Sequence, residues 1–265
     1  MCATCGCGDH DADHESHHRH AHGPDEVPHV HPHQSPHTVR LEHEVLAKND
    51  RRADQNRAWL DERGVVALNL MSSPGAGKTT LLERTLRELG NEMAIGVIEG
   101  DQATVRDAER IRAAGGRVVQ INTGSGCHLD ADMIAAALRE LDPPARSLVL
   151  IENVGNLVCP ALFGLGERAK VVMMSVTEGE DKPLKYPHMF RASDVMVLSK
   201  VDLLPHLDFD KARCLEFARR INPRLEILET SATRGEGLAA WYARLRASVG
   251  EGGASAERAE PRPRA

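Results

Sequence analysis

Aromatic residues are scarce in this chain of 265 residues. Phe, Trp and Tyr together make up 3% of it, so the core of any domain must be aliphatic. No stretch approaches the roughly 18 apolar residues of a membrane-spanning helix, and the N-terminus lacks the charged-then-apolar pattern of a secretory signal. Positive charge is not in excess either: 33 Lys and Arg against 39 Asp and Glu leave a formal charge of −6, which argues against a general nucleic-acid-binding protein. We therefore expect a cytoplasmic protein with no membrane or nucleic-acid partner, whose six cysteines are metal ligands or free thiols rather than disulfides.

Histidine is concentrated near the N-terminus. Residues 1–37 contain three cysteines and ten of the 14 histidines, with Pro and Asp between them and few large apolar side chains. Such a segment cannot bury enough surface to offset the entropy lost on ordering, so we predict a disordered tail over residues 1–40. Thiols and imidazoles bind divalent transition metals, although a tail without a role is the alternative. The candidate ligands are Cys2, Cys5, Cys7, His17, His18, His20, His22, His29, His31 and His33.

The rest of the chain alternates short apolar runs with helix-like stretches, and we assign residues 41–249 to one domain. Several runs are too uniformly apolar to be half-exposed strands, and strand–helix alternation favours a parallel sheet with helices on both faces. We therefore predict an α/β fold with a mostly parallel seven-stranded sheet, followed by a flexible C-terminal tail over residues 250–265. The predicted strands are 65–71, 93–98, 117–121, 147–151, 170–176, 194–198 and 225–229, and the main predicted helices are 79–90, 104–115, 130–141, 208–221 and 237–249.

The first predicted strand leads into the sequence SSPGAGKTT at residues 72–80, which is typical of the phosphate loop of a P-loop NTPase. Glycines let the backbone turn its N–H groups around a phosphate, and the following helix adds its dipole. Lys78 is expected to reach the β and γ phosphates, and the Thr79 hydroxyl to bind Mg²⁺. Ser72 replaces the first glycine of the pattern, and a chance turn before a helix is the alternative. The predicted phosphate-binding residues are Gly75, Ala76, Gly77, Lys78, Thr79 and Thr80.

A second motif indicates that the base is guanine. The predicted strand 194–198 is followed by Ser199, Lys200 and, two residues later, Asp202, which resembles the Asn-Lys-x-Asp motif of GTPases. A carboxylate there accepts hydrogen bonds from both N1–H and the exocyclic amine of guanine, whereas adenine lacks this pair of donors. Because the usual Asn ties loops together, we expect Ser199 to weaken binding. Downstream, Ser231 and Ala232 resemble the loop that meets the guanine carbonyl, and a surface turn is the alternative.

Carboxylates at the ends of two other predicted strands are candidate magnesium ligands. Asp101 and Glu152 both fall on the expected nucleotide side of the sheet, where they join Thr79 in the predicted Mg²⁺ site. Gly155 stands where a switch glycine would donate its N–H to the γ-phosphate. We assign catalytic roles to Lys78, Asp101 and Gly155, while a helix cap or an exposed loop charge is the alternative for each carboxylate.

Two further loops on the same side carry Cys127, His128 and Cys159. Thiolate and imidazole suit Zn²⁺ or Ni²⁺ better than Mg²⁺. Cys159 lies four residues beyond Gly155, so a movement of that glycine with nucleotide state would move a metal ligand. On spacing alone, two buried cysteines and a loop histidine with no shared ligand remain the simpler interpretation.

Taken together, these motifs resemble the HypB family of hydrogenase nickel-incorporation GTPases. The resemblance rests on the N-terminal CxxCGC, the His-rich tail, SSPGAGKTT, EGDQATVRDAERI, QINTGSGCHLDADMI, LIENVGNLVCP and SKVDLLP. It implies a nickel metallochaperone that hydrolyses GTP with Mg²⁺ and promotes nickel insertion into [NiFe]-hydrogenase. It also implies a high-affinity nickel site and a second nickel or zinc site. The residues that match them are Cys2, Cys5 and Cys7 for the first site and Cys127, His128 and Cys159 for the second.

The partners that the resemblance implies are the maturation protein HypA, the hydrogenase large subunit and a second copy of the chain in a nucleotide- or metal-dependent homodimer. Three alternatives stay open: a urease-accessory-type GTPase, a MinD-like ATPase and a nickel storage protein. The first leaves CxxCGC unexplained, and MinD-like loops carry a second lysine near the position of Ser73.

Overall fold

Seven strands form one sheet, and all six neighbouring pairs are parallel, so the predicted fold class is confirmed. The computed structural model describes residues 36–101, 106–124, 126 and 128–258. The strand order is β3-β2-β4-β1-β5-β6-β7. The strands are β1 (Val66–Ser72), β2 (Ile95–Asp101), β3 (Arg117–Asn122), β4 (Leu148–Glu152), β5 (Ala169–Ser175), β6 (Val195–Ser199) and β7 (Glu226–Thr230).

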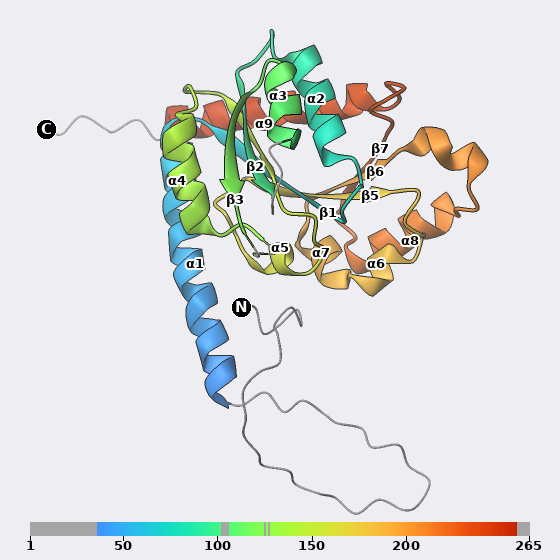
Figure 1. Cartoon of the computed structure of the whole chain (residues 1–265), viewed down its shortest axis with the longest axis horizontal. Helices are drawn as coiled ribbons and strands as arrows, with labels where there is room; N and C mark the ends of the chain where they lie inside the picture. The colour runs from blue at the N-terminus through green and yellow to red at the C-terminus, as the bar shows by residue number, and fades with distance from the viewer. Residues whose placement is uncertain (1–35, 102–105, 125, 127, 259–265) are drawn as a thin grey trace, which may run out of the picture.

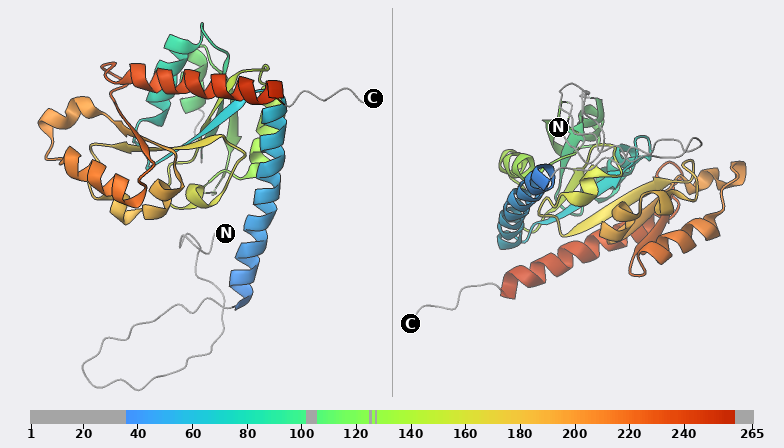
Figure 2. Two further views of the ribbon diagram at one scale, coloured as in Figure 1. Left: turned by 180° about the vertical axis from the view of Figure 1, so that it is seen from behind. Right: turned by 90° about the horizontal axis from the view of Figure 1, so that it is seen from below.

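Helices cover both faces of this sheet (Figures 1 and 2). One face is covered by α2, α3 and α9, and the other by α1, α4, α7 and α8, with α1 and α4 side by side. The helices are α1 (Pro36–Glu62), α2 (Lys78–Leu89), α3 (Arg106–Ala113), α4 (Ala131–Leu141), α5 (Cys159–Leu162), α6 (Lys182–Lys185), α7 (Pro187–Ala192), the 3₁₀ helix η1 (Val201–His206), α8 (Lys211–Ile221) and α9 (Leu238–Arg258).

The core is aliphatic, as the scarcity of aromatic residues predicts. Every residue of β1, β4 and β6 is buried, which is typical of parallel strands covered on both faces. Trp241 is a buried exception on α9, and its indole N–H donates to the Thr85 hydroxyl at 3.0 Å. This hydrogen bond satisfies the polar group of an otherwise apolar side chain and fixes α9 against α2.

Two helices extend into segments that we predicted to be tails. The first, α1, begins at Pro36, inside the predicted N-terminal tail, and its first turns extend beyond the sheet (Figure 1). The second, α9, ends at Arg258, inside the predicted C-terminal tail. Glycines near residue 250 favour an earlier end, but extending an existing helix is far easier than nucleating one, and α9 is already anchored by Trp241 and Leu245. Within the described ranges, no helix has both the length and the apolar character to cross a bilayer.

The strand order fixes where a ligand binds. The chain runs from β1 outward to β2 and β3, returns to β4 beside β1, and then continues on the other side of β1 with β5. In such doubly wound sheets, ligands bind beyond the carboxyl ends of the strands at the point where the order reverses. That point is the end of β1, between β4 and β5, and the predicted phosphate loop begins there.

Candidate functional site

The loop between β1 and α2 has the backbone of a phosphate-binding loop. Its two glycines, Gly75 and Gly77, have φ angles of +75° and +100°, a region that other residues rarely adopt. The helix α2 begins at Lys78 directly after Gly77, so the first N–H groups of α2 are at the mouth of the loop. The predicted strand–loop–helix unit is therefore confirmed as a structural element.

Lys78 is buried across this loop and held by Ser72. Its Nζ donates to Ser72 Oγ at 2.9 Å, and Ser72 Oγ donates to the carbonyl of Ser73 at 2.6 Å. Burial lowers the pKa of Lys78, while the nearby Glu152 carboxylate opposes this effect. Ser72, which departs from the glycine of the pattern, thus supplies a hydroxyl that orients the lysine.

Thr79 and Glu152 meet directly at the end of the loop. Thr79 Oγ1 donates to Glu152 Oε1 at 2.8 Å, and both residues are buried. The second carboxylate oxygen, Oε2 of Glu152, is buried without a hydrogen-bond partner among the described residues. Burial raises the pKa of Glu152, with the Lys78 ammonium acting in the opposite direction. A hydroxyl beside an unsatisfied carboxylate oxygen is the donor set that a hard divalent cation prefers, so these two residues fit Mg²⁺.

Asp101 and Gly155 complete the predicted catalytic set. Asp101 is the last residue of β2, at the same edge of the sheet, and its side chain lies outside the described residues. Gly155 packs against the phosphate loop so closely that a Cβ would lie 3.0 Å from Pro74 Cγ and 3.1 Å from Pro74 Cα. A larger residue at this position would displace either the loop after β4 or the phosphate loop. The loop that follows Glu152 is therefore in contact with the loop that would bind phosphate.

A pocket of about 240 Å³ joins the phosphate loop to the predicted base-binding motif. It brings together segments that follow β1, β6 and β7 of the sheet. Ala232 lines this pocket, whereas Ser231 is not among the lining residues and instead accepts a hydrogen bond from Arg234 N at 3.1 Å within the following turn. The lining residues are Ala76, Gly77, Thr80, Leu81, Met173, Ser199, Lys200, Asp202, Leu203, Thr230, Ala232 and Thr233.

Two residues of the base-binding motif hold the phosphate loop. Ser199 Oγ donates to the carbonyl of Ala76 at 2.7 Å. We expected the replacement of Asn by Ser to cost a tie between loops, but the serine hydroxyl makes such a tie itself. Lys200 Nζ donates to the carbonyl of Gly75 at 2.8 Å. The Lys200 backbone has a φ of +60°, which is unusual for a residue with a side chain. These contacts fix the distance between the phosphate-binding and base-binding segments.

Sequence reasoning missed two residues of α3, the helix that lies beside α2 (Figure 1). Arg110 binds Asp107 at 2.9 Å on its own helix and Glu83 at 2.9 Å on α2, and it also donates to Thr80 Oγ1 at 3.3 Å. The Asp107 carboxylate acts on the titration of both Lys78 and Glu152, so it belongs to the same electrostatic site. Pairs of Asp and Arg three residues apart occur on many helices, so the sequence carried no specific signal for this role.

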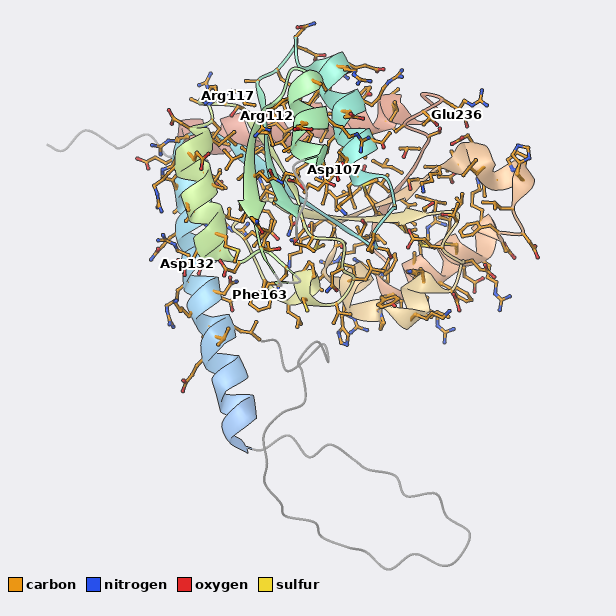
Figure 3. All side chains as sticks on the ribbon, in the orientation of Figure 1. Asp107, Arg112, Arg117, Asp132, Phe163 and Glu236 are labelled. Carbon is orange, nitrogen blue, oxygen red and sulfur yellow. The ribbon has the colours of Figure 1, made fainter. Side chains whose placement is uncertain are left out.

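The loops of the predicted second metal site also lie against each other. His128 stacks on Phe163 with ring centroids 4.0 Å apart, and Phe163 follows α5, the helix that begins at Cys159 (Figure 3). Cys159 is buried, and burial lowers the pKa of His128 while the Asp130 carboxylate opposes the change. The neutral imidazole that results is the form that binds metals.

The predicted metal sites are only partly within the described residues. Among the side chains that the structure describes, no three His, Cys, Asp or Glu residues form a group that could hold a metal ion. Cys127, the third predicted ligand of the domain site, lies outside the described residues, and so does the whole predicted nickel tail with Cys2, Cys5, Cys7 and its histidines. These ligand assignments remain predictions.

Comparison with known proteins agrees with this geometry. The family model described as "CobW/HypB/UreG, nucleotide-binding domain" matches residues 66–229. The chain is 57% identical over 211 residues to the hydrogenase maturation factor HypB of Rhizobium leguminosarum bv. viciae, covering 80% of this chain and 71% of the relative. It is also 57% identical over 203 residues to HypB of Escherichia coli K12, covering 77% of this chain and 70% of that protein.

Solved structures give the same result. The crystal structure of HypB from Archaeoglobus fulgidus superposes with a TM-score of 0.72 at 45% identity, over 77% of this chain and 99% of that one. HypB from Helicobacter pylori, crystallised in complex with nickel, gives a TM-score of 0.72 at 38% identity, over 77% of this chain and 96% of that one. The chain therefore belongs to the CobW/HypB/UreG family of nucleotide-binding proteins and, within it, to the hydrogenase maturation factors HypB.

Proposed function

We propose that the protein is a GTP-hydrolysing nickel metallochaperone that promotes nickel insertion into [NiFe]-hydrogenase. The observation that carries the nucleotide part is the pocket in which the phosphate loop meets Lys200 and Asp202. Adenine lacks the two donors that guanine offers to the Asp202 carboxylate, and an acceptor that a bound base covers without pairing is costly. GTP is therefore the proposed substrate.

The chain's own residues supply most of the hydrolytic site. Lys78 exchanges its bond to Ser72 for contacts to the β- and γ-phosphate oxygens, which the N–H groups at the start of α2 also bind. Thr79 and Glu152 are the proposed Mg²⁺ ligands, with Asp101 at the end of the neighbouring strand. When bound, Mg²⁺ neutralises charge that develops on the phosphate oxygens. Gly155 is the proposed donor to the γ-phosphate, because the loop that contains it already contacts Pro74.

Nickel is the proposed cargo. The H. pylori relative was crystallised in complex with nickel, and thiolate and imidazole ligands suit Ni²⁺ and Zn²⁺. We propose that Cys2, Cys5 and Cys7 bind nickel in the tail, and that Cys127, His128 and Cys159 bind nickel or zinc in the GTPase domain. HypA, the hydrogenase large subunit and a second copy of the chain are the proposed partners.

Base specificity tests the nucleotide assignment. The wild-type chain should hydrolyse GTP in preference to ATP, and Asp202→Asn should shift the preference toward xanthosine triphosphate, because its C2 carbonyl accepts from an amide. Steady-state turnover with the three nucleotides at equal Mg²⁺ measures both effects. Equal turnover of GTP and ATP by the wild type would overturn the assignment.

A further inference from the structure

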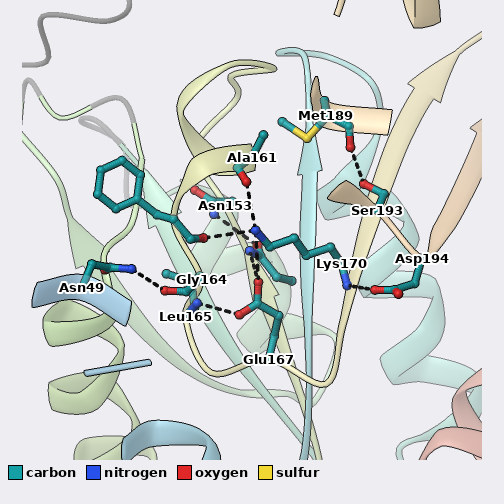
Figure 4. A network of polar contacts seen from close by, with 12 residues as sticks. Asn49, Asn153, Ala161, Gly164, Leu165, Glu167, Lys170, Met189, Ser193 and Asp194 are labelled. Carbon is teal, nitrogen blue, oxygen red and sulfur yellow. Dashed lines mark hydrogen bonds and ion pairs between the residues drawn. The ribbon is translucent and has the colours of Figure 1, made fainter. Parts of the chain in front are cut away.

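Three polar side chains form a buried chain through the centre of the sheet. Asn69 lies in the middle of β1, Asn153 follows β4, and Glu167 precedes β5, and their exposed fractions are 0%, 1% and 4%. Asn153 Nδ2 donates to Asn69 Oδ1 at 3.1 Å, and Asn69 Nδ2 donates to Glu167 Oε1 at 3.3 Å (Figure 4). An unpaired buried polar group destabilises the fold. If one of these side chains moves, the next must therefore follow it, or a hydrogen bond between them is lost.

The first end of this chain is attached to the nucleotide side. Asn153 directly follows Glu152, which binds the Thr79 hydroxyl, and it precedes Gly155 by two residues. Its Oδ1 accepts from the N–H of Leu129 at 3.3 Å, and Leu129 is the residue after His128. One side chain therefore connects the end of β4 to the loop that carries a predicted metal ligand.

The second end reaches the segment after Cys159. Glu167 Oε2 accepts from the N–H of Leu165 at 2.6 Å, and Oε1 lies 3.8 Å from Lys170 Nζ. Lys170 Nζ in turn donates to the carbonyls of Ala161 at 3.1 Å and Phe163 at 3.4 Å, as Figure 4 shows. Phe163 carries the ring that stacks on His128, so both ends of the chain converge on the loops of the second metal site.

We propose that Asn69 is a positioning residue that couples the two sites: it transmits displacement of the loop after β4 from Asn153 to Glu167, and so to the segment after Cys159. The inference rests on the proposed function, because it requires that the domain bind both GTP and nickel, and it adds the residue through which nucleotide state would act on metal binding. Within the described part of the chain, the Asn69 side chain bonds to Asn153 and Glu167, and neither of these belongs to the phosphate loop or to the predicted metal ligands. This link explains why a polar residue lies between Leu68 and Leu70 in a fully buried strand, since an aliphatic residue there would need no partners.

Asn69→Leu tests the link because it removes the middle member of the hydrogen-bonded network. Asn153 and Glu167 keep their bonds to their own loops. The assay uses the full chain with Cys2, Cys5 and Cys7 replaced by Ser, so that the thiolate-to-Ni²⁺ charge-transfer band reports the domain cysteines. Ni²⁺ is titrated in the presence of GDP and of a non-hydrolysable GTP analogue. The unmutated background should show affinities that differ by about 5–150-fold between the two nucleotides. Asn69→Leu should reduce this ratio to about 1 while GTP turnover in the absence of nickel stays within about twofold.

Asn49→Leu is the matched control. Asn49 is also a buried asparagine whose side chain bonds to the segments after Cys159 and His128. Its Nδ2 donates to the carbonyl of Gly164 at 2.8 Å, and its Oδ1 accepts from the N–H of Ala131 at 2.9 Å. Among the described residues, neither Asn69 nor Asn153 is its partner. It should change nickel affinity equally with both nucleotides and preserve the ratio. If Asn69→Leu does not fold, Asn69→Ser, which is too short to hold both partners, provides the same test.

The proposal is overturned if a folded Asn69 variant keeps the ratio of nickel affinities that the unmutated background shows between the two nucleotides. It is also overturned if Asn49→Leu lowers that ratio as much as the Asn69 variant does. Failure of the proposed function is recognised separately, because it appears in the background chain before Asn69 is changed, as absence of GTP binding or of a nickel–thiolate band. If the background protein binds GTP and nickel but has the same nickel affinity with both nucleotides, the coupling role of Asn69 is refuted. The assignments of the GTP site and the nickel site then stay intact.

Discussion

Replacing Ser199 by Ala should weaken GTP binding through a contact that sequence motifs do not reveal. The Ser199 hydroxyl is buried at the end of β6 and donates to the carbonyl of Ala76 at 2.7 Å, so it ties the base-binding segment to the phosphate loop. Ser199→Ala removes the donor and leaves a buried carbonyl oxygen without this partner. The bond from Lys200 Nζ to the carbonyl of Gly75 still ties the two segments, but their separation is held less tightly and GTP must restore it on binding.

The expected magnitude follows from this one hydrogen bond. A buried hydrogen bond contributes about 1 kcal/mol to the free energy of unfolding, and an acceptor left unsatisfied costs about 1–3 kcal/mol. We expect the variant to lose about 1–2 kcal/mol of stability. If the same energy must be spent when GTP orders the loop, the dissociation constant of GTP rises about 5–30-fold. Ser199→Asn, which restores the usual residue of the GTPase motif, should recover most of the affinity.

Ser193→Ala is the matched control for this prediction. Ser193 is also a buried serine that donates to a backbone carbonyl, that of Met189, at 2.8 Å, but it lies at the opposite end of β6 from the pocket. Chemical denaturation should give similar stability losses for Ser193→Ala and Ser199→Ala. Titration with a fluorescent GTP analogue should give weakened binding for Ser199→Ala alone. Equal GTP affinities in the two variants would refute the role of the Ser199 tie.

Three further outcomes are expected. Lys78→Ala should abolish GTP turnover, because the lysine ammonium is the proposed phosphate contact. The variant should remain folded, because burial disfavours the ammonium and the substitution removes that desolvation penalty. Turnover within twofold of the wild type would contradict the phosphate-loop role of Lys78. Deleting residues 8–37 should lower the number of nickel ions bound per chain and leave GTP turnover almost unchanged, whereas a large loss of turnover would show that this segment supports the domain. Burial raises the pKa of Cys214 to about 12, so its thiolate is scarce near neutral pH and the thiol should resist alkylation in the native protein; labelling at the rate of the unfolded chain, followed by peptide mass spectrometry, would contradict its burial.

The strands and the nucleotide pocket could be predicted because their signals are local. A uniformly apolar run predicts a strand covered on both faces, and the SSPGAGKTT sequence specifies its own turn. Contacts between distant residues could not be predicted. Asn153 and Asn69 are separated by 84 residues, and Ser199 and Ala76 by 123, so nothing in either local sequence names the partner. From the motif alone we expected Ser199 to lose the contact between loops that Asn makes in GTPases. In the structure, the Ser199 hydroxyl makes a contact of this kind with the phosphate loop.

The claim that nucleotide state governs nickel binding is tested most directly by one titration. Ni²⁺ affinity of the domain site is measured in the wild-type chain with GDP and with a non-hydrolysable GTP analogue. Because Gly155 contacts Pro74 and lies four residues before Cys159, we predict affinities that differ by about 5–150-fold, a difference that Cys159→Ala abolishes and Cys5→Ala leaves in place. Identical affinities with the two nucleotides would contradict the account and would leave the domain site with a structural role.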